Sequence, residues 1–391
     1  MHTLFGENIL SPPPQEEEQA STNPFDLAFN SNPPATSDAS GGSSLQQNDW
    51  LTQHVQNLSV VDGATSYSHG EQSGPPPRRK GNPRLLFMGL RRCGKSSVQK
   101  VVFEKLPPAE TLYLEATTKI ERASMQSFMT FDSAELPTSL PVQSPDYDHA
   151  SIFTNIGSVI WIIDSQDEYL TSISELLRLA VFLAENYPRI NLEVFIHKTD
   201  GLSEEYKYDT FREVRQRVQD ELTDYGYGDR PVSYYQTSIF DHSIFEAMSK
   251  VIMKLLPALP SMETLLTKLC STCRIQKAYL FDTLSKIYIA TDTSPTFLKD
   301  YEVCSDYVDV IVDIKQLYGW RDEGKQGDQN SIEESMVSFD KSGDTYIYTR
   351  EISNNLSLIC LMGQGSGPNM RPVLDYNVEI LNGALQKVFK V

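Results

Sequence analysis

Residues 85–103 read LLFMGLRRCGKSSVQKVVF and contain the complete pattern G-x-x-x-x-G-K-S between Gly89 and Ser96. The apolar run before Gly89 predicts a buried strand, and the apolar residues after Ser97 recur at helical spacing. A strand, a glycine-containing loop and a helix in this order form a phosphate-binding P-loop. Glycine permits the tight turn, while successive N–H groups and the start of the helix attract an anion. The sequence therefore predicts a nucleotide phosphate site.

Individual side chains of this loop have distinct expected roles. We expect Lys95 to reach the β- and γ-phosphates and the Ser96 hydroxyl to bind Mg²⁺. The alternative is a chance match in a glycine-containing turn, and the flanking strand and helix argue against it. The other loop residues that we expect to contact nucleotide are Gly89, Arg91, Arg92, Cys93, Gly94 and Ser97.

A second motif indicates which base is bound. The apolar run 192–196 ends in His197-Lys198-Thr199-Asp200, a variant of the N-K-x-D motif of guanine-nucleotide binders. A carboxylate at Asp200 can accept from both N1–H and the exocyclic amine of guanine, and adenine offers no such pair of donors. Hydrogen bonds of this charge-assisted kind contribute roughly 1.5–3 kcal/mol each. The sequence therefore favours guanine over adenine.

The neighbours of Asp200 complete the expected base site. The Lys198 stem can lie along one face of the base. His197 stands where Asn is usual, and it fits either a ligand contact or a strand-end histidine bonded to backbone. Farther along, Thr237-Ser238-Ile239 closes another strand-like segment. We expect Ser238 and Ile239 to bring a backbone N–H to guanine O6.

The chain resembles Rag GTPases, and specifically the RagC/RagD subclass with its fungal counterpart. The resemblance covers residues 83–391 and implies that Thr117 is the switch I threonine, which completes the Mg²⁺ shell and contacts the γ-phosphate. With Lys95, it would be a catalytic residue. The segments that carry the resemblance are 89–97, 110–117, 159–169, 195–203, 237–245, 277–282 and 285–295.

One segment departs from the family pattern. The family carries a D/E-x-P-G-Q-like segment, and Glu135 and Pro137 align with it, but Thr138 and Ser139 replace the glycine and the glutamine. A Cβ at the glycine hinders close approach to the γ-phosphate. Losing one such donor typically costs ~2.7–4 kcal/mol of transition-state stabilisation. Two interpretations stay open at this point: a real loss of catalytic competence, or an error in the gene model.

Composition excludes several classes of protein. A net charge of −18 and a pI of about 4.8 argue against nucleic-acid binding. Five scattered cysteines fit a reducing compartment, and we interpret Cys270-x-x-Cys273 as two helix residues rather than a metal or redox site. No signal peptide, apolar span or lipidation motif is expected, so membrane residence would depend on a partner. The cluster Arg78-Arg79-Lys80 fits solvated linker charge, with attraction to a membrane surface as the alternative.

The pattern of elements predicts three regions. Residues 1–80 are rich in Pro, Ser, Gln and Gly, which predicts a disordered tail. Residues 81–256 alternate between strands and helices, which predicts an α/β doubly wound, Ras-like P-loop GTPase domain. Residues 257–391 predict helices flanking an antiparallel sheet, and the resemblance implies an α+β roadblock/longin-type dimerisation domain. The expected elements lie at 84–88, 95–106, 128–132, 157–163, 168–186, 192–197, 204–225, 232–237, 243–255, 261–273, 276–282, 285–290, 297–317, 334–339, 345–350, 356–362 and 372–389.

The resemblance also implies a cellular role. A C/D-type subunit pairs with an A/B-type Rag subunit, cycles between GTP and GDP with Mg²⁺, and needs a GTPase-activating protein. The heterodimer would sit on a scaffold complex at the cytoplasmic face of the vacuolar or lysosomal membrane, with cytoplasm and nucleus as further locations. There it would relay amino-acid sufficiency to the TOR complex. Two alternatives remain: a hydrolysis-deficient scaffolding subunit, supported by Thr138 and Ser139, and a small-molecule P-loop kinase, which His197–Asp200 disfavours.

Overall fold

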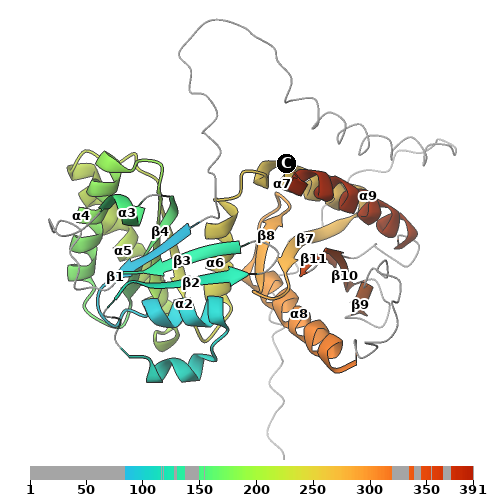
Figure 1. Ribbon diagram of the computed structural model, residues 1–391, viewed down its shortest axis with the longest axis horizontal. Coiled ribbons are helices and arrows are strands. Elements are labelled where there is room, and N and C mark those ends of the chain that lie inside the picture. The colour runs from blue at the N-terminus through green and yellow to red at the C-terminus, as the bar shows by residue number, and fades with distance from the viewer. Residues whose placement is uncertain are drawn as a thin grey trace, which may run out of the picture. The chain divides into compact units, whose positions relative to one another are not determined.

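The computed structural model describes residues 84–115, 117, 119–126, 130–136, 149–153, 155–318, 334–338, 345–353, 355–363 and 371–390. These residues form two β-sheets with helices packed on each (Figure 1). The expected tail, including Arg78–Lys80, lies outside the described residues, as do Thr138 and Ser139.

The first sheet has six strands in the order β2-β3-β1-β4-β5-β6, and its one antiparallel pair is β2 with β3. Since β1, β4, β5 and β6 are parallel, their carboxyl ends meet at one edge, which is where such sheets bind ligands. Gly89, Asp164, His197 and Thr237 end these strands. The strands are β1 (Arg84–Gly89), β2 (Glu121–Gln126), β3 (Thr130–Glu135), β4 (Ile156–Asp164), β5 (Asn191–His197) and β6 (Val232–Thr237).

Helices cover both faces of this sheet. Helix α4 contacts α5, and α2 contacts α6, so the helices form two layers (Figure 1). The buried face of α4 carries Ile173, Leu176, Ala180 and Leu183 at helical spacing, and it packs on the apolar side chains of β4 and β5. The elements are α2 (Lys95–Glu104), η1 (Pro108–Tyr113), α3 (His149–Phe153), α4 (Leu170–Asn186), η2 (Thr199–Gly201), α5 (Glu204–Asp224) and α6 (Ser243–Met253).

The second sheet is antiparallel, with the order β8-β7-β11-β10-β9. Its core is aromatic: the rings of Phe281 and Tyr301 stack 5.7 Å apart, and Tyr279 and Tyr288 pack against them. The elements are α7 (Leu259–Cys273), β7 (Ile275–Asp282), β8 (Ile287–Thr291), α8 (Leu298–Tyr318), β9 (Glu334–Ser338), β10 (Tyr346–Ser353), β11 (Leu356–Met362) and α9 (Arg371–Lys390).

The predicted fold class is confirmed, with a parallel-sheet P-loop domain followed by an antiparallel sheet with helices. Helix α6 ends at Met253 and α7 begins at Leu259, so the predicted boundary at residue 257 falls between them. Three elements were not predicted: β2, η1 and α3. The predicted strand 128–132 was misplaced, since β3 begins at residue 130 and ends at Glu135. Strand β2 lies at the sheet edge and is largely exposed, so its residues show no apolar pattern.

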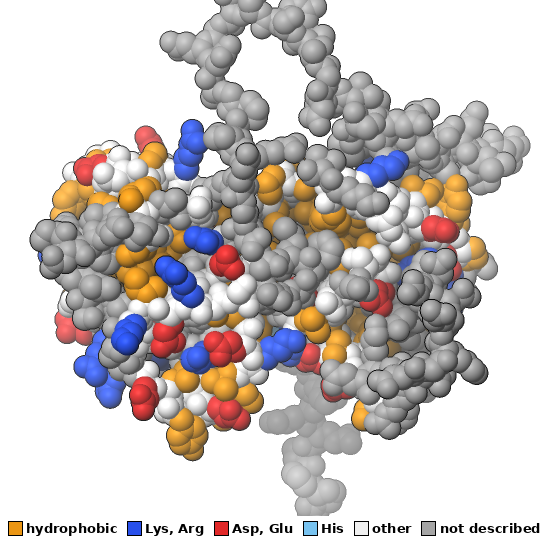
Figure 2. All heavy atoms as spheres, in the orientation of Figure 1, with side chains coloured by type: hydrophobic (Ala, Val, Ile, Leu, Met, Phe, Trp, Pro, Cys, Tyr) orange, Lys and Arg blue, Asp and Glu red, His pale blue; other side chains and the backbone are white. Residues whose placement is uncertain are grey.

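All five cysteines are free and buried. Cys270 and Cys273 lie on α7, as predicted for two helix residues. Within the described ranges, no helix has the length and apolar character needed to cross a membrane. The short helix η1 exposes Leu112 and Tyr113 almost fully. Hydrophobic side chains project at the lower edge of the molecule in Figure 2, below the position of α2 in Figure 1.

Candidate nucleotide site

The P-loop joins β1 to α2 and is packed too tightly for side chains at its two glycines. Gly89 has φ 141° and Gly94 has φ 103°, a region that favours glycine. A Cβ on Gly89 would lie 2.4 Å from the Ile162 carbonyl oxygen, and one on Gly94 would lie 2.6 Å from Cδ2 of His197. The glycines therefore allow the loop to lie directly on β4 and β5.

Lys95 extends back over the loop from the first position of α2. Its Nζ donates to the carbonyl oxygens of Gly89 at 3.1 Å and Leu90 at 2.9 Å, and the residue is only 6% exposed. Arg91 and Arg92 are exposed, whereas Cys93 is buried and burial raises the pKa of its thiol. The ammonium group is thus held at the loop, where phosphate oxygens can replace carbonyl oxygens.

Three oxygen-bearing side chains converge beside the loop. Ser96 Oγ lies 2.9 Å from Thr117 Oγ1 and donates to Glu135 Oε1 at 2.9 Å. Glu135 ends β3 and is 1% exposed, and no described residue bonds to its Oε2. Burial raises the pKa of this carboxyl, and the Ser96 hydrogen bond opposes that rise. The cluster therefore brings together hydroxyl and carboxyl oxygens, the ligands that Mg²⁺ prefers.

Glu135 is not among the residues that the sequence predicts for the site, although it aligns with the family's acidic position. The sequence predicts a strand that ends at residue 132, which leaves Glu135 outside it, whereas β3 ends at Glu135. A signal was available: an acidic residue at the carboxyl end of a strand that pairs with β1 faces the P-loop edge of the sheet.

The two motifs that the sequence predicts to read the base lie side by side. Ser238 Oγ donates to Asp200 Oδ1 at 2.7 Å, joining the loop after β5 to the loop after β6. The N–H of Ser238 donates to Ser243 Oγ at 2.9 Å, so this N–H serves the start of α6 rather than a base in this structure. Ile239, the other residue expected to supply an N–H, is buried beside it.

Lys198 links the base loop to the P-loop. It adopts a left-handed conformation with φ 62°, and its Nζ donates to the Arg92 carbonyl oxygen at 2.8 Å and to Asp164 Oδ2 at 2.5 Å. Gln166 Nε2 donates to the Lys198 carbonyl oxygen at 2.7 Å. Asp164 and Gln166 were not predicted as site residues, and they hold Lys198 in place from the end of β4.

His197 lies beneath the P-loop rather than at its surface. The side chain is buried, its Nδ1 lies 3.0 Å from Thr237 Oγ1, and its Cδ2 edge faces Gly94. Burial lowers the pKa of this imidazole to about 4, with the charge of Lys198 as a second cause. His197 is therefore neutral at physiological pH and supports the loop from behind, which matches the structural alternative and not the ligand contact.

Comparison with known proteins agrees with this geometry. The conserved region of Gtr1/RagA G proteins matches residues 84–308. GTP-binding protein gtr2 of Schizosaccharomyces pombe is 46% identical over 307 residues, covering 78% of this chain and 98% of that protein. Ras-related GTP-binding protein C of Homo sapiens is 43% identical over 314 residues, 79% of this chain and 77% of that protein. The chain belongs to the Gtr/Rag family.

Within the Gtr/Rag family, the similarity points to the Gtr2/RagC subclass. GTP-binding protein GTR1 of Saccharomyces cerevisiae is only 22% identical, over 287 residues that cover 70% of this chain and 89% of that protein. The resemblance to the C/D-type subclass in the sequence is thus confirmed. The Gtr/Rag positions replaced by Thr138 and Ser139 lie outside the described residues, and none of these similarities favours a hydrolysis-deficient subunit over a GTPase.

Proposed function

We propose that this chain is a C/D-type guanine-nucleotide-binding subunit of a Rag-type heterodimeric GTPase, which converts GTP to GDP and phosphate. The observation that carries the proposal is the convergence of three features at one edge of the first sheet. These are the P-loop lysine Lys95, the oxygen cluster at Ser96 and the Asp200 carboxylate. The first two suit a magnesium–phosphate group, and the third suits guanine.

Mg²⁺ fits the residues beside the loop, because Glu135 keeps one buried oxygen to which no described residue bonds. We propose that Ser96, Thr117 and Glu135 would hold the ion. When bound, it would neutralise charge on the β- and γ-phosphates. Lys95 would bind the same phosphates, and the dipole at the start of α2 would favour their charge. Thr117 would couple the γ-phosphate to the segment after η1.

Single-turnover hydrolysis tests the proposed activity. The purified heterodimer should hydrolyse labelled GTP slowly, and an activating protein should accelerate it by about 10³–10⁵-fold. Thr117→Ala should lower this activated rate. Thr111→Ala is the matched control, since the Thr111 hydroxyl donates to the Pro108 carbonyl oxygen within η1 and lies outside the cluster. GTP binding without turnover, even with the activating protein, would instead support a scaffolding subunit.

An A/B-type subunit is the proposed partner, bound through the second sheet. Strand β9 is the edge of that sheet, with Met336 and Val337 exposed, and an exposed edge can pair with a strand of another chain. Helix α8 also exposes an apolar stripe, defined here as Val303, Val310, Ile314 and Leu317. Burial of this stripe and edge against a like domain would stabilise a heterodimer.

We also propose the cellular role that the Rag resemblance implies. The heterodimer would be tethered by a scaffold complex at the vacuolar or lysosomal membrane and would relay amino-acid sufficiency to the TOR complex. Fluorescently tagged chain should mark that membrane in cells that contain the A/B-type partner and should disperse when the partner is deleted. Membrane localisation that persists without the partner would contradict tethering through it.

A further inference from the structure

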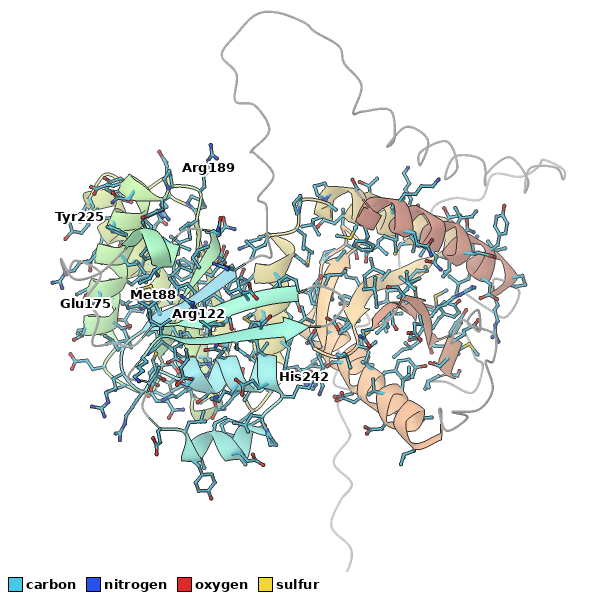
Figure 3. All side chains as sticks on the ribbon, viewed as in Figure 1. Met88, Arg122, Glu175, Arg189, Tyr225 and His242 are labelled. Carbon is cyan, nitrogen blue, oxygen red and sulfur yellow. The ribbon has the colours of Figure 1, made fainter. Side chains whose placement is uncertain are left out.

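A groove between α4 and α5 is not used by the proposed nucleotide site. It has a volume of about 370 Å³ and extends from Ser174 to Tyr225, the residue that follows α5. Val181 and Phe182 form its apolar side, and Tyr225 is 63% exposed beside them. Figure 3 shows Glu175 and Tyr225 on this outer side of the two helices. The groove is therefore partly aromatic and open to a ligand.

The groove carries unbalanced negative charge. Among the described residues that line it, Glu185 and Glu221 are acidic and Arg178 is basic. Arg178 donates to Glu175 at 2.6 Å, and Glu185 also accepts from the Tyr227 hydroxyl at 3.1 Å. Neither α4 nor α5 has a basic residue in its last turn. The negative ends of both helix dipoles thus add to the carboxylates. A ligand with clustered positive charge would be attracted here.

We propose that the chain's own segment Pro75-Pro76-Pro77-Arg78-Arg79-Lys80 docks in this groove. Its composition complements the groove, since proline-rich segments bind along aromatic-lined grooves and arginine pairs with carboxylates by two parallel hydrogen bonds. Tyr225 would pack on the prolines, and Glu185 and Glu221 would pair with the basic residues.

The segment joins the described chain at the sheet edge where α4 and α5 end. The described chain begins at Arg84 in β1, which pairs with Ile156 in the neighbouring strand β4. Two residues farther along β4, Ser158 pairs with Asn191 of β5, which lies shortly after the end of α4. Two strand spacings are about 10 Å. An extended chain covers about 13 Å from Lys80 to Arg84 and about 30 Å from Pro75. Because α4 and α5 end at the sheet edge opposite the nucleotide, docking would leave the nucleotide site open.

Distance measurement between spin labels tests the proposal in the full-length chain. The five native cysteines are buried, so cysteines introduced at the exposed Thr171 and at Ser73 can be labelled selectively. Docking predicts a single narrow distance distribution. It should broaden in the E185Q/E221Q variant and in 1 M salt, where the Debye length falls from about 10 Å to about 3 Å.

A matched control removes equal charge elsewhere on α5. The E204Q/E205Q variant, at the other end of that helix, should keep the narrow distribution. A broad distribution in the unmodified chain, or a narrow one that E185Q/E221Q leaves unchanged, would overturn the proposal. Dilution with unlabelled chain must leave the distance distribution unchanged. If dilution removes the narrow distance, the labels belong to two different copies of the chain, and docking within one chain is overturned. Co-sedimentation with phosphatidylserine vesicles is a further measurement. If it requires Arg78 and Arg79, and the distance distribution is broad, then the basic residues bind membranes and the docking proposal is overturned.

Discussion

At the scale of single residues, Asp200 is held at one carboxylate oxygen by the Ser238 hydroxyl, 2.7 Å away. The Asp200→Asn variant replaces an acceptor with a donor, so it should move preference from guanine toward xanthine. We expect guanine affinity to fall about 10- to 100-fold, since a bond to a charged acceptor contributes about 1.5–3 kcal/mol. A competition titration with GDP and XDP measures the change. Asp224→Asn is the control, and unchanged preference in D200N would remove Asp200 from this role.

Replacement of the Glu135 carboxylate by an amide should raise stability and weaken metal binding. Because burial raises the pKa of this carboxyl, its ionised form disfavours the folded state, and that cost appears as pH rises through the folded pKa. Glu135→Gln keeps an acceptor for Ser96 and removes the charge. We therefore expect a higher melting temperature at pH 7 without Mg²⁺, and weaker binding of Mg²⁺–GTP. A variant that binds Mg²⁺–GTP as tightly as the wild-type chain would contradict the metal assignment.

His197 should make stability depend on pH. A pKa lowered from 6.5 to about 4 stabilises the folded state fully above pH 6.5, and this contribution is lost as pH falls toward 4. The loss reaches about 3 kcal/mol at full protonation. His197→Asn keeps a polar partner for Thr237 but does not titrate. Urea midpoints at pH 7 and pH 5 should differ less in this variant than in wild type, and equal differences would refute the interpretation.

At the scale of elements, a half-buried ion pair joins the end of α6 to β5, the strand next to the edge strand β6. Lys254 Nζ contacts both oxygens of the buried Glu193 on β5, at 3.0 and 2.8 Å, and also contacts Tyr235. Lys254→Met should cost about 1–3 kcal/mol of unfolding free energy, because it leaves the buried Glu193 carboxylate without its partner, whereas water already screens the 37% exposed Lys254. The double variant Glu193→Gln/Lys254→Met should recover much of the lost unfolding free energy, because it has no charge at position 193, and chemical denaturation measures the difference.

The control for this prediction lies on α6 itself, one turn before Lys254. Lys250 pairs with Glu246 one turn away, and such a pair contributes about 0.3–0.5 kcal/mol. Lys250→Met should therefore lower stability far less than Lys254→Met. Equal losses in the two variants would show that the position of Glu193 in the sheet does not matter.

At the scale of the whole molecule, the apolar stripe of α8 should govern pairing with the A/B-type subunit. Val310 and Ile314 are each 52% exposed, and an aspartate at either position would place a charge in the proposed interface. V310D and I314D should lose co-purification with the partner while retaining nucleotide. V373D on α9, where the native side chain is 39% exposed, is the matched control. Equal loss in V373D would mean that the stripe is not the interface.

The sequence alone determined the P-loop, the guanine-reading motif, the alternation of strands and helices and the family. Each of these depends on local spacing: glycines at the turns of 89–94, apolar periodicity along α4 and α5, and short motifs at strand ends. Spacing along the chain was enough because neighbouring residues decide backbone conformation and which face is apolar. The polar edge strand β2 lacks such a pattern and was missed.

Only the tertiary structure decided which distant side chains meet. It placed Glu135 against Ser96, 39 positions away, set Lys198 between Arg92 and Asp164, and put His197 behind Gly94. These contacts arise because parallel strands bring their carboxyl ends to one edge, whatever the length of chain between them. Strand register and helix packing set those distances, and neither can be read from spacing along one chain.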